Sequence, residues 1–252
     1  MSVKSLLRAV LPARLARLAG QTKLAWIARN ESVSFSAYGE DLVILSWLRR
    51  FGCDLTAVRY LDVGAADPIH LSNTFLLYCA GARGVLIEPD PDQAAALRRA
   101  RPRDIVINAG AAFDERRSAR YFRMTSSVFN SFSEEQATRV AEMSKTWAPG
   151  QRQDIVATVE VPLVPVNDVI REHLPGRGPD FISVDVEGAE LAIAKTIDFA
   201  LMNGDPKIPA FFCVEALAKL RDLKPLLDPH GFKMIARTAD NWVFRRHPHE
   251  ME

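Results

Sequence analysis

The stretch Arg59-Tyr-Leu-Asp-Val-Gly-Ala-Ala-Asp-Pro-Ile-His-Leu-Ser-Asn73 decides the fold of this chain. It opens with a short apolar run typical of a buried strand, carries Asp62 near the end of that strand, and turns at Gly64. An acid at the carboxyl end of a strand, followed by a glycine turn, is a common nucleotide-binding arrangement in open α/β sheets. Glu88 ends a second apolar run at the place where a ribose-binding acid is expected. The two acids together predict a nucleotide-type site.

Apolar runs and helical patterns alternate on both sides of this stretch. The sequence predicts strands at 59–63, 84–88, 105–108, 180–185 and 210–215, and helices at 42–51, 75–80, 93–100, 165–173, 191–199 and up to 227. This alternation predicts parallel strands with helices on both faces of one sheet. It is interrupted at about 114–165, where we expect an insertion on the substrate side: an extra strand at 118–124, a polar loop, a helix at 133–147 and a β-rich run at 155–164 that Pro162 interrupts.

The end of the chain predicts how the sheet closes. Apolar runs at 231–237 and 241–246 are joined by a short turn, which leaves no room for a crossover, so these strands must be antiparallel. Five parallel strands with a C-terminal antiparallel hairpin describe the seven-stranded, Rossmann-like sheet of class I methyltransferases. We therefore expect an α/β domain at 34–252 of the 252-residue chain.

Charge is distributed unevenly along the chain. The net charge of +1 gives no reason to expect nucleic acid as a partner. Residues 1–33 are predicted to form a basic amphipathic helical segment, because leucines alternate with cations and no acid occurs before residue 31. That segment either packs on the protein or at an oligomer interface, or makes peripheral contact with an anionic membrane surface.

Cysteine usage and hydropathy indicate the compartment. Cys53, Cys79 and Cys213 are too scattered for a metal site and are interpreted as reduced thiols. No apolar run is long enough to span a bilayer, and arginines break up any secretory signal. We expect a cytoplasmic protein, with the inner face of the membrane as the alternative location.

Several motifs in order resemble the FkbM family of S-adenosylmethionine-dependent methyltransferases. The matching segments are Ser36-Ala-Tyr-Gly-Glu-Asp41, Leu61-Asp-Val-Gly-Ala65 with Pro68 and Ser72-Asn-Thr74, Ile87-Glu-Pro89, Phe129-Asn-Ser-Phe-Ser133 and Phe181-Ile-Ser-Val-Asp-Val-Glu-Gly-Ala-Glu190. Together they cover about residues 34–215. The resemblance implies S-adenosylmethionine as the cofactor and a hydroxyl as the methyl acceptor.

With that cofactor, Gly64 and Ala65 would let the methionine end approach the main chain, and Asp62 would attract its ammonium group. Glu88 can accept both ribose hydroxyls, because a carboxylate has two acceptor oxygens. Asn108 and Ala109, after the third strand, are expected near the adenine edge. Ser72 and Asn73 either cap a helix or contact the cofactor's carboxylate. The run Gly64-Ala-Ala-Asp67 lacks the G-x-G-x-x-G pattern, which counts against NAD.

The catalytic groups are expected after the fourth strand. Asp185 is the preferred base for the acceptor hydroxyl, with Glu187 beside it. His70 is either a surface histidine or a base at the mouth of the cleft. A carboxylate in this cluster can also hold a divalent cation, but clusters without histidine are unspecific, so no metal ligand is assigned. Substrate contacts are expected from Ser127, Asn130, Glu190 and Glu215.

These observations predict an O-methyltransferase that acts on a hydroxyl, most readily that of a sugar in a glycan, polysaccharide or glycolipid. An acceptor such as a polyketide is the first alternative. A cofactor-binding or scaffold protein that has the fold without turnover is the second. The (Asn/Asp)-Pro-Pro-aromatic motif of amino-group methyltransferases is missing after the fourth strand, which argues against methylation of DNA bases.

Overall fold

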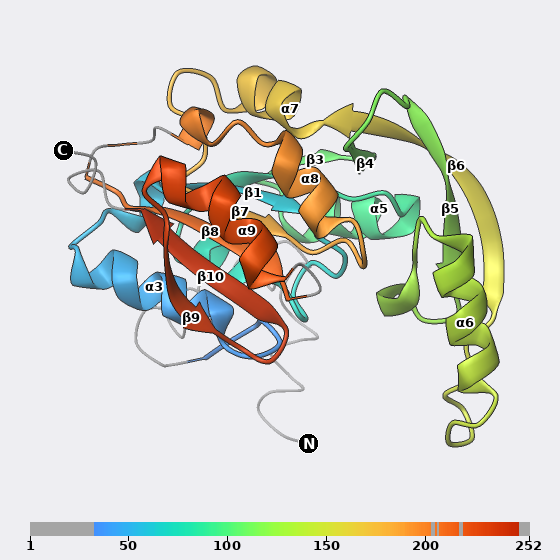
Figure 1. The fold of residues 1–252 in the computed structure, drawn as a ribbon. Helices are drawn as coiled ribbons and strands as arrows, with labels where there is room; N and C mark the ends of the chain where they lie inside the picture. Colours follow the sequence, from blue (N-terminus) through green and yellow to red (C-terminus); the bar gives the residue numbers. More distant parts are fainter. Residues whose placement is uncertain (1–32, 203–204, 206, 217–218, 247–252) are drawn as a thin grey trace, which may run out of the picture.

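The computed structural model describes residues 33–202, 205, 207–216 and 219–246 (Figure 1). The predicted N-terminal helical segment, with its two alternative roles, lies outside the described residues. Within the described part of the chain, no helix is long and apolar enough to cross a membrane.

A seven-stranded sheet forms the centre, in the order β3-β2-β1-β7-β8-β10-β9. Its strands are β1 (Arg59–Val63), β2 (Arg83–Ile87), β3 (Ile105–Ile107), β7 (Phe181–Val184), β8 (Ala210–Glu215), β9 (Lys233–Arg237) and β10 (Asn241–Arg246). The first five are parallel, whereas β10 runs antiparallel to both β8 and β9. The predicted class I methyltransferase sheet, with its terminal hairpin, is confirmed.

Helices cover both faces of this sheet because both faces of its central strands are apolar. Side chains of α3 (Glu40–Arg50), α4 (Phe75–Cys79) and α5 (Pro91–Ala100) pack in one buried cluster against one face. Side chains of α7 (Val166–His173), α8 (Glu190–Thr196) and α9 (Leu220–Leu227) pack in a second cluster against the other. Short 3-10 turns at Leu55–Ala57, Ser127–Phe129, Phe199–Met202 and Asp228–His230 complete the connections. The core therefore consists of two apolar layers separated by the sheet.

A second sheet stands to one side of the central one (Figure 1). It has the order β4-β6-β5, with β4 at Gly110–Ala112, β5 at Ser118–Met124 and β6 at Ile155–Pro165. Helix α6 (Glu134–Ser144) packs on it through Ala137, which is buried with Phe122 and Met124. We call β5, α6 and β6 the arm. The arm brings residues far from β1 in sequence over the carboxyl end of the central sheet.

Several elements differ from those that the sequence predicts, and three of the differences have a clear physical reason. The strand β4 was not expected: its Gly-Ala-Ala sequence has no strong strand preference, and only its pairing with β6 defines it. Pro162 does not interrupt β6: the amide of Leu163 bonds toward β5, and the pairing of β6 with β4 begins only at Leu163, so β4 has no acceptor that needs an amide at residue 162. The predicted helix at 191–199 ends at Thr196 and is followed by a separate 3-10 turn.

The turn after β1 has little space for any residue but glycine. Gly64 has φ +86, and a Cβ atom added there would lie 1.8 Å from the main-chain oxygen of Asp185. The amide of Gly64 donates to Ile87 O at 2.9 Å. The ends of β1, β2 and β7 thus meet around a residue that has no side chain.

We predict that Gly64→Ala destabilises the protein far more than Gly150→Ala does. Gly150 has a similar φ of +85 with nothing within 4 Å of an added Cβ, so its variant isolates the backbone strain, about 1–2 kcal/mol. The clash with Asp185 should add about 1–3 kcal/mol to that in Gly64→Ala. Urea unfolding of the two variants measures the difference, and equal losses would show that the turn opens at no cost.

Candidate active site

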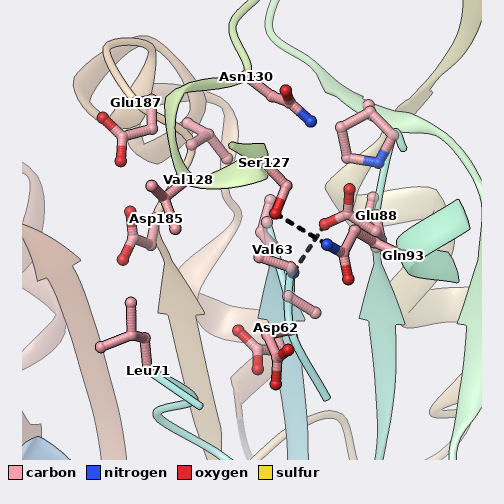
Figure 2. A pocket seen from close by; sticks show the side chains of 18 of the residues that line it. Asp62, Val63, Leu71, Glu88, Gln93, Ser127, Val128, Asn130, Asp185 and Glu187 are labelled. Carbon is pink, nitrogen blue, oxygen red and sulfur yellow. Dashed lines mark hydrogen bonds between the residues drawn. The ribbon is translucent and has the colours of Figure 1, made fainter. Parts of the chain in front are cut away.

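A pocket lies at the carboxyl ends of β1, β2 and β7 (Figure 2). Of the residues that the sequence predicts for the site, it brings together Asp62, Gly64, Ala65, His70, Ser72, Asn73, Glu88, Ser127, Asn130, Asp185 and Glu187. Asn108, Ala109, Glu190 and Glu215 do not line it. In Figure 2, Glu88 and Gln93 lie on one side of β1, and Asp185 and Glu187 lie on the other. The site therefore has two chemically distinct sides.

Glu88 forms the first side. Its Oε2 accepts the amide of Ala66 at 2.7 Å and its Oε1 accepts the amide of Asp90 at 2.7 Å. Burial outweighs these hydrogen bonds and raises the pKa of Glu88 to about 7. Each oxygen keeps a lone pair after these contacts, so Glu88 can still accept two hydroxyl donors from a ligand.

Asp62 lies at the floor, between the two sides, and is only 4% exposed. Its Oδ2 accepts the hydroxyl of Thr74 at 2.6 Å. Burial raises the pKa of Asp62, while the nearby charge of Arg101 acts in the opposite direction. The sequence analysis missed Arg101, since an arginine at the end of a predicted helix is normally exposed. A buried acid that needs a counter-charge was the signal that could have pointed to it.

The segment between β1 and α4 curves around the pocket. Ser72 Oγ accepts the amides of Thr74 and Phe75 at the start of α4, whose N-cap residue is Thr74. Asn73 donates from Nδ2 to Ser183 Oγ at 3.1 Å, which ties the segment to β7. Both residues line the pocket as well. His70 lies exposed at its mouth, with its amide bonded to Asp67.

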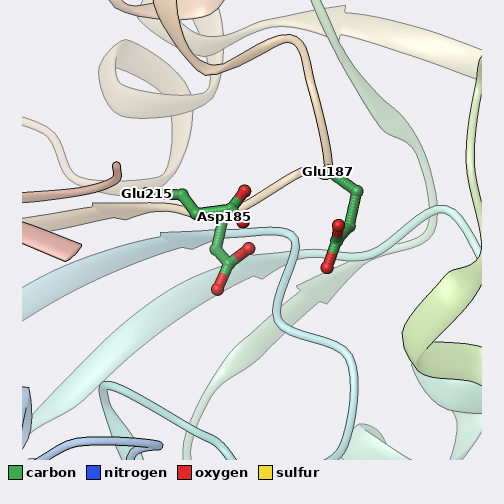
Figure 3. Close-up of side chains that lie close together, drawn as sticks. All are labelled: Asp185, Glu187 and Glu215. Atoms are coloured by element: carbon green, nitrogen blue, oxygen red, sulfur yellow. The ribbon is translucent and has the colours of Figure 1, made fainter. Parts of the chain in front are cut away.

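Three carboxylates converge on the second side (Figure 3). Asp185, Glu187 and Glu215 can each bring one oxygen atom within 4.8 Å of the others. Burial and then the neighbouring acids raise the pKa of Asp185 to about 7, that of Glu215 to about 9, and also that of Glu187. Among the described residues, none of the three forms an ion pair with a basic side chain. The surroundings of this side therefore favour the protonated forms of the three acids.

Glu190, a predicted substrate contact, is hydrogen-bonded to the main chain of its own loop. It is 2% exposed, and its Oε1 accepts the amides of Val186 and Gly188 at 3.2 and 2.8 Å. The helix α8 begins only at Glu190, and Glu187 precedes it with φ +59, so the two acids do not share a helix face. The geometry assigns Glu190 to the loop that positions Glu187.

Two residues that are predicted to lie near the adenine edge, Asn108 and Ala109, are not among the residues that line the pocket. Asn108 donates from Nδ2 to Glu88 O at 2.9 Å and to Pro89 O at 3.0 Å, which fixes the main chain at the end of β2. Ala109 is 1% exposed and forms no part of the lining. The predicted contact of these two residues with the adenine edge stays a prediction.

The loop before α6 closes the pocket from the arm. Ser127 Oγ accepts Gln93 Nε2 at 2.9 Å (Figure 2). Asn130 donates to Asp90 Oδ2 at 3.1 Å and accepts the amide of Met124 at 2.7 Å, so its polar atoms already have partners. Arg123 also bonds Asp90, at 2.8 Å. The sequence analysis missed these partners, although Asp90 before Pro91 has the pattern of a helix cap.

We predict a pH-dependent gap in stability between the native protein and Glu215→Gln. A folded-state pKa of about 9 lies above the ordinary value of 4.5, so folded Glu215 keeps a proton that the unfolded chain loses. The native protein should therefore lose stability relative to the neutral variant as pH rises from about 4.5 to about 9. Thermal melting across this range measures the gap, with Glu115→Gln as the exposed control. A gap that does not grow with pH would contradict the buried, protonated state.

The family model described as the methyltransferase FkbM domain matches residues 62–215, which contain both sides of the pocket. No match is found among curated proteins. Similar solved structures include cofactor-bound Rv0187 from MTB, at 13% identity over 98% of this chain and 96% of that one with a TM-score of 0.42. Another is the O-methyltransferase from Bacillus cereus in complex with SAH, at 11% identity over 96% of each chain with a TM-score of 0.39.

The family of this chain follows from the family model. That model spans more than half of the chain and includes Asp62, Glu88, Asp185 and Glu187. The sequence motifs, the strand order and this match agree. The chain belongs to the FkbM family of methyltransferases.

Proposed function

We propose that this chain is an S-adenosylmethionine-dependent O-methyltransferase that acts on a hydroxyl of a sugar, in a glycan, polysaccharide or glycolipid. The observation that carries the proposal is the pairing of Asp62 and Glu88 at the ends of adjacent strands, on either side of the Gly64 turn. A methyltransferase family supplies the reaction class, and the pocket supplies the groups that its cofactor requires.

The pocket residues fit this cofactor. Glu88 has acceptor capacity left for two ribose hydroxyls after bonding two amides. Asp62 offers a buried carboxylate to an ammonium group, and Gly64 leaves the main chain open where a Cβ would collide with Asp185. When bound, the cofactor supplies a methyl group on a positively charged sulfur.

Asp185 is the proposed base. It lines the pocket beside Gly64 and Glu187, and its pKa of about 7 is close to the value at which a base works best at neutral pH. The carboxylate would accept the proton of the acceptor hydroxyl as that oxygen takes the methyl group. Glu187 would orient the hydroxyl, and exposed His70 would be a second proton acceptor at the mouth. A sugar supplies such a hydroxyl, and the polar insertion favours an acceptor of that kind.

Binding of the demethylated product, S-adenosylhomocysteine, tests the proposal directly. Isothermal titration of the full-length protein should show one site per chain. Glu88→Gln should weaken binding about tenfold to a hundredfold, because hydrogen bonds to a charged group are worth about 1.5–3 kcal/mol. Glu115→Gln, an exposed change of the same type, should have no effect. No heat of binding, or binding that Glu88→Gln leaves unchanged, would refute the cofactor assignment.

For the base, we predict that Asp185→Asn keeps its affinity for S-adenosylhomocysteine but loses methyl transfer by roughly two to four orders of magnitude. The amide cannot accept a proton from the hydroxyl, whereas the pocket keeps its shape. Transfer of a labelled methyl group to a glycan extract of the source cells measures the rate. Turnover at the native rate would remove Asp185 from the mechanism.

A further inference from the structure

A second cavity lies under the arm, next to the pocket. It has a volume of about 550 Å³, within the usual range of about 300–1,000 Å³ for small-molecule sites. Residues of β5, of the segment that leads into α6, and of the loop before α8 line it. We call it the arm cavity.

The arm cavity and the pocket share a wall. Ala111, Phe132, Val186 and Glu187 line both of them. The aromatic ring of Phe132 packs over Gly110 so closely that an added Cβ there would lie 2.5 Å from the ring. A molecule held in the arm cavity would therefore meet the pocket at Glu187.

The backbone at this wall is held in an unusual conformation. Glu187 has φ +59, in the left-handed region that residues other than glycine rarely adopt, and Glu190 bonds the amides on both sides of it. Such conformations persist only where the surrounding contacts enforce them, and they concentrate at functional sites. The loop thus fixes the Glu187 carboxylate between the two cavities.

The lining of the arm cavity combines ring faces with polar groups. Phe113, Phe122 and Phe132 contribute aromatic surface. Ser131, Ser133 and Gln136 contribute hydroxyl and amide groups. Ser131 Oγ and Ser133 Oγ accept the amides of Ser133 and Gln136, and each hydroxyl can still donate its proton to a ligand oxygen. A pyranose ring has C–H bonds on its faces and hydroxyls around its edge, so it matches both kinds of surface.

The charges of the lining indicate a neutral ligand. Arg116 is bonded to Asp114 at 2.7 Å and Arg120 to Glu134 at 2.7 Å, so each of the two arginines that line the cavity already has an acidic partner. Glu187 adds an acidic side chain, which has no basic partner among the described residues. An anionic sugar would have to displace an acid from one of the arginines and would place its charge beside Glu187 and the acids next to it.

We propose that the arm cavity is the acceptor site and that it takes a neutral sugar ring, with the hydroxyl to be methylated held against Glu187. This inference rests on the proposed function and extends it: it assigns the site, the charge of the acceptor and the residues that select it. Ala119, which lines the cavity from β5, marks the place where a bulky side chain would fill it.

Saturation-transfer NMR on the full-length protein, saturated with S-adenosylhomocysteine, tests this proposal. The probes are the methyl glycosides of glucose, galactose, mannose and rhamnose, with methyl glucuronide as the anionic match and cyclohexanol as the apolar one. At least one neutral glycoside should receive saturation, more strongly than either matched probe. Ala119→Trp should abolish that signal, and Thr158→Trp, at an exposed position of β6 that lines neither cavity, should leave it unchanged.

Silence of all four neutral glycosides would overturn the inference, as would a stronger signal from methyl glucuronide or cyclohexanol, or a signal that survives Ala119→Trp. Titration of S-adenosylhomocysteine into the same samples distinguishes a failure of the proposed function from a failure of the acceptor-site inference. If the cofactor product fails to bind, the proposed function is wrong. If it binds to the native protein and both variants while no glycoside signal meets these criteria, only the acceptor assignment is wrong.

Discussion

The buried guanidinium of Arg101 is the contact on which the pocket depends. It is 0% exposed and donates to Asp104, Tyr60, Thr74 and Ser72 at 2.7 to 3.3 Å. Through these bonds, one cation at the end of α5 connects β1 with the segment that precedes α4. Its charge also offsets the burial of Asp62, whose carboxylate would otherwise face an apolar core without a counter-charge. The floor of the site can be acidic and rigid because Arg101 lies behind it.

The opposite side of the site consists of acidic side chains that repel one another. Asp185, Glu187 and Glu215 crowd together without a basic partner among the described residues, and burial together with their mutual repulsion raises the pKa of all three. This arrangement destabilises the free protein at high pH. It also provides groups able to exchange a proton near neutrality, which a methyl transfer to a hydroxyl requires. The acidic cluster thus lowers the stability of the protein at the place where the proton transfer is proposed.

The sequence predicted the central sheet well because the relevant signals are local. Apolar runs, the glycine at residue 64 and the short final turn each specify a strand or a reversal without reference to distant residues. It predicted Asp62 and Glu88 for the same reason, since each acid ends its own strand. It did not predict β4 or Arg101, because both depend on partners far away in the chain. Nor could it show that polar atoms of Glu190 and Asn130 are hydrogen-bonded to a nearby main-chain amide and to the Asp90 side chain, respectively.

A crystal structure with S-adenosylhomocysteine bound is the most direct measurement of the central claim. The account predicts the ribose hydroxyls on Glu88, the amino-acid end beside Gly64 and Asp62, and the sulfur facing Asp185. A ligand found in the arm cavity, or anywhere that leaves Glu88 without contact, would contradict it.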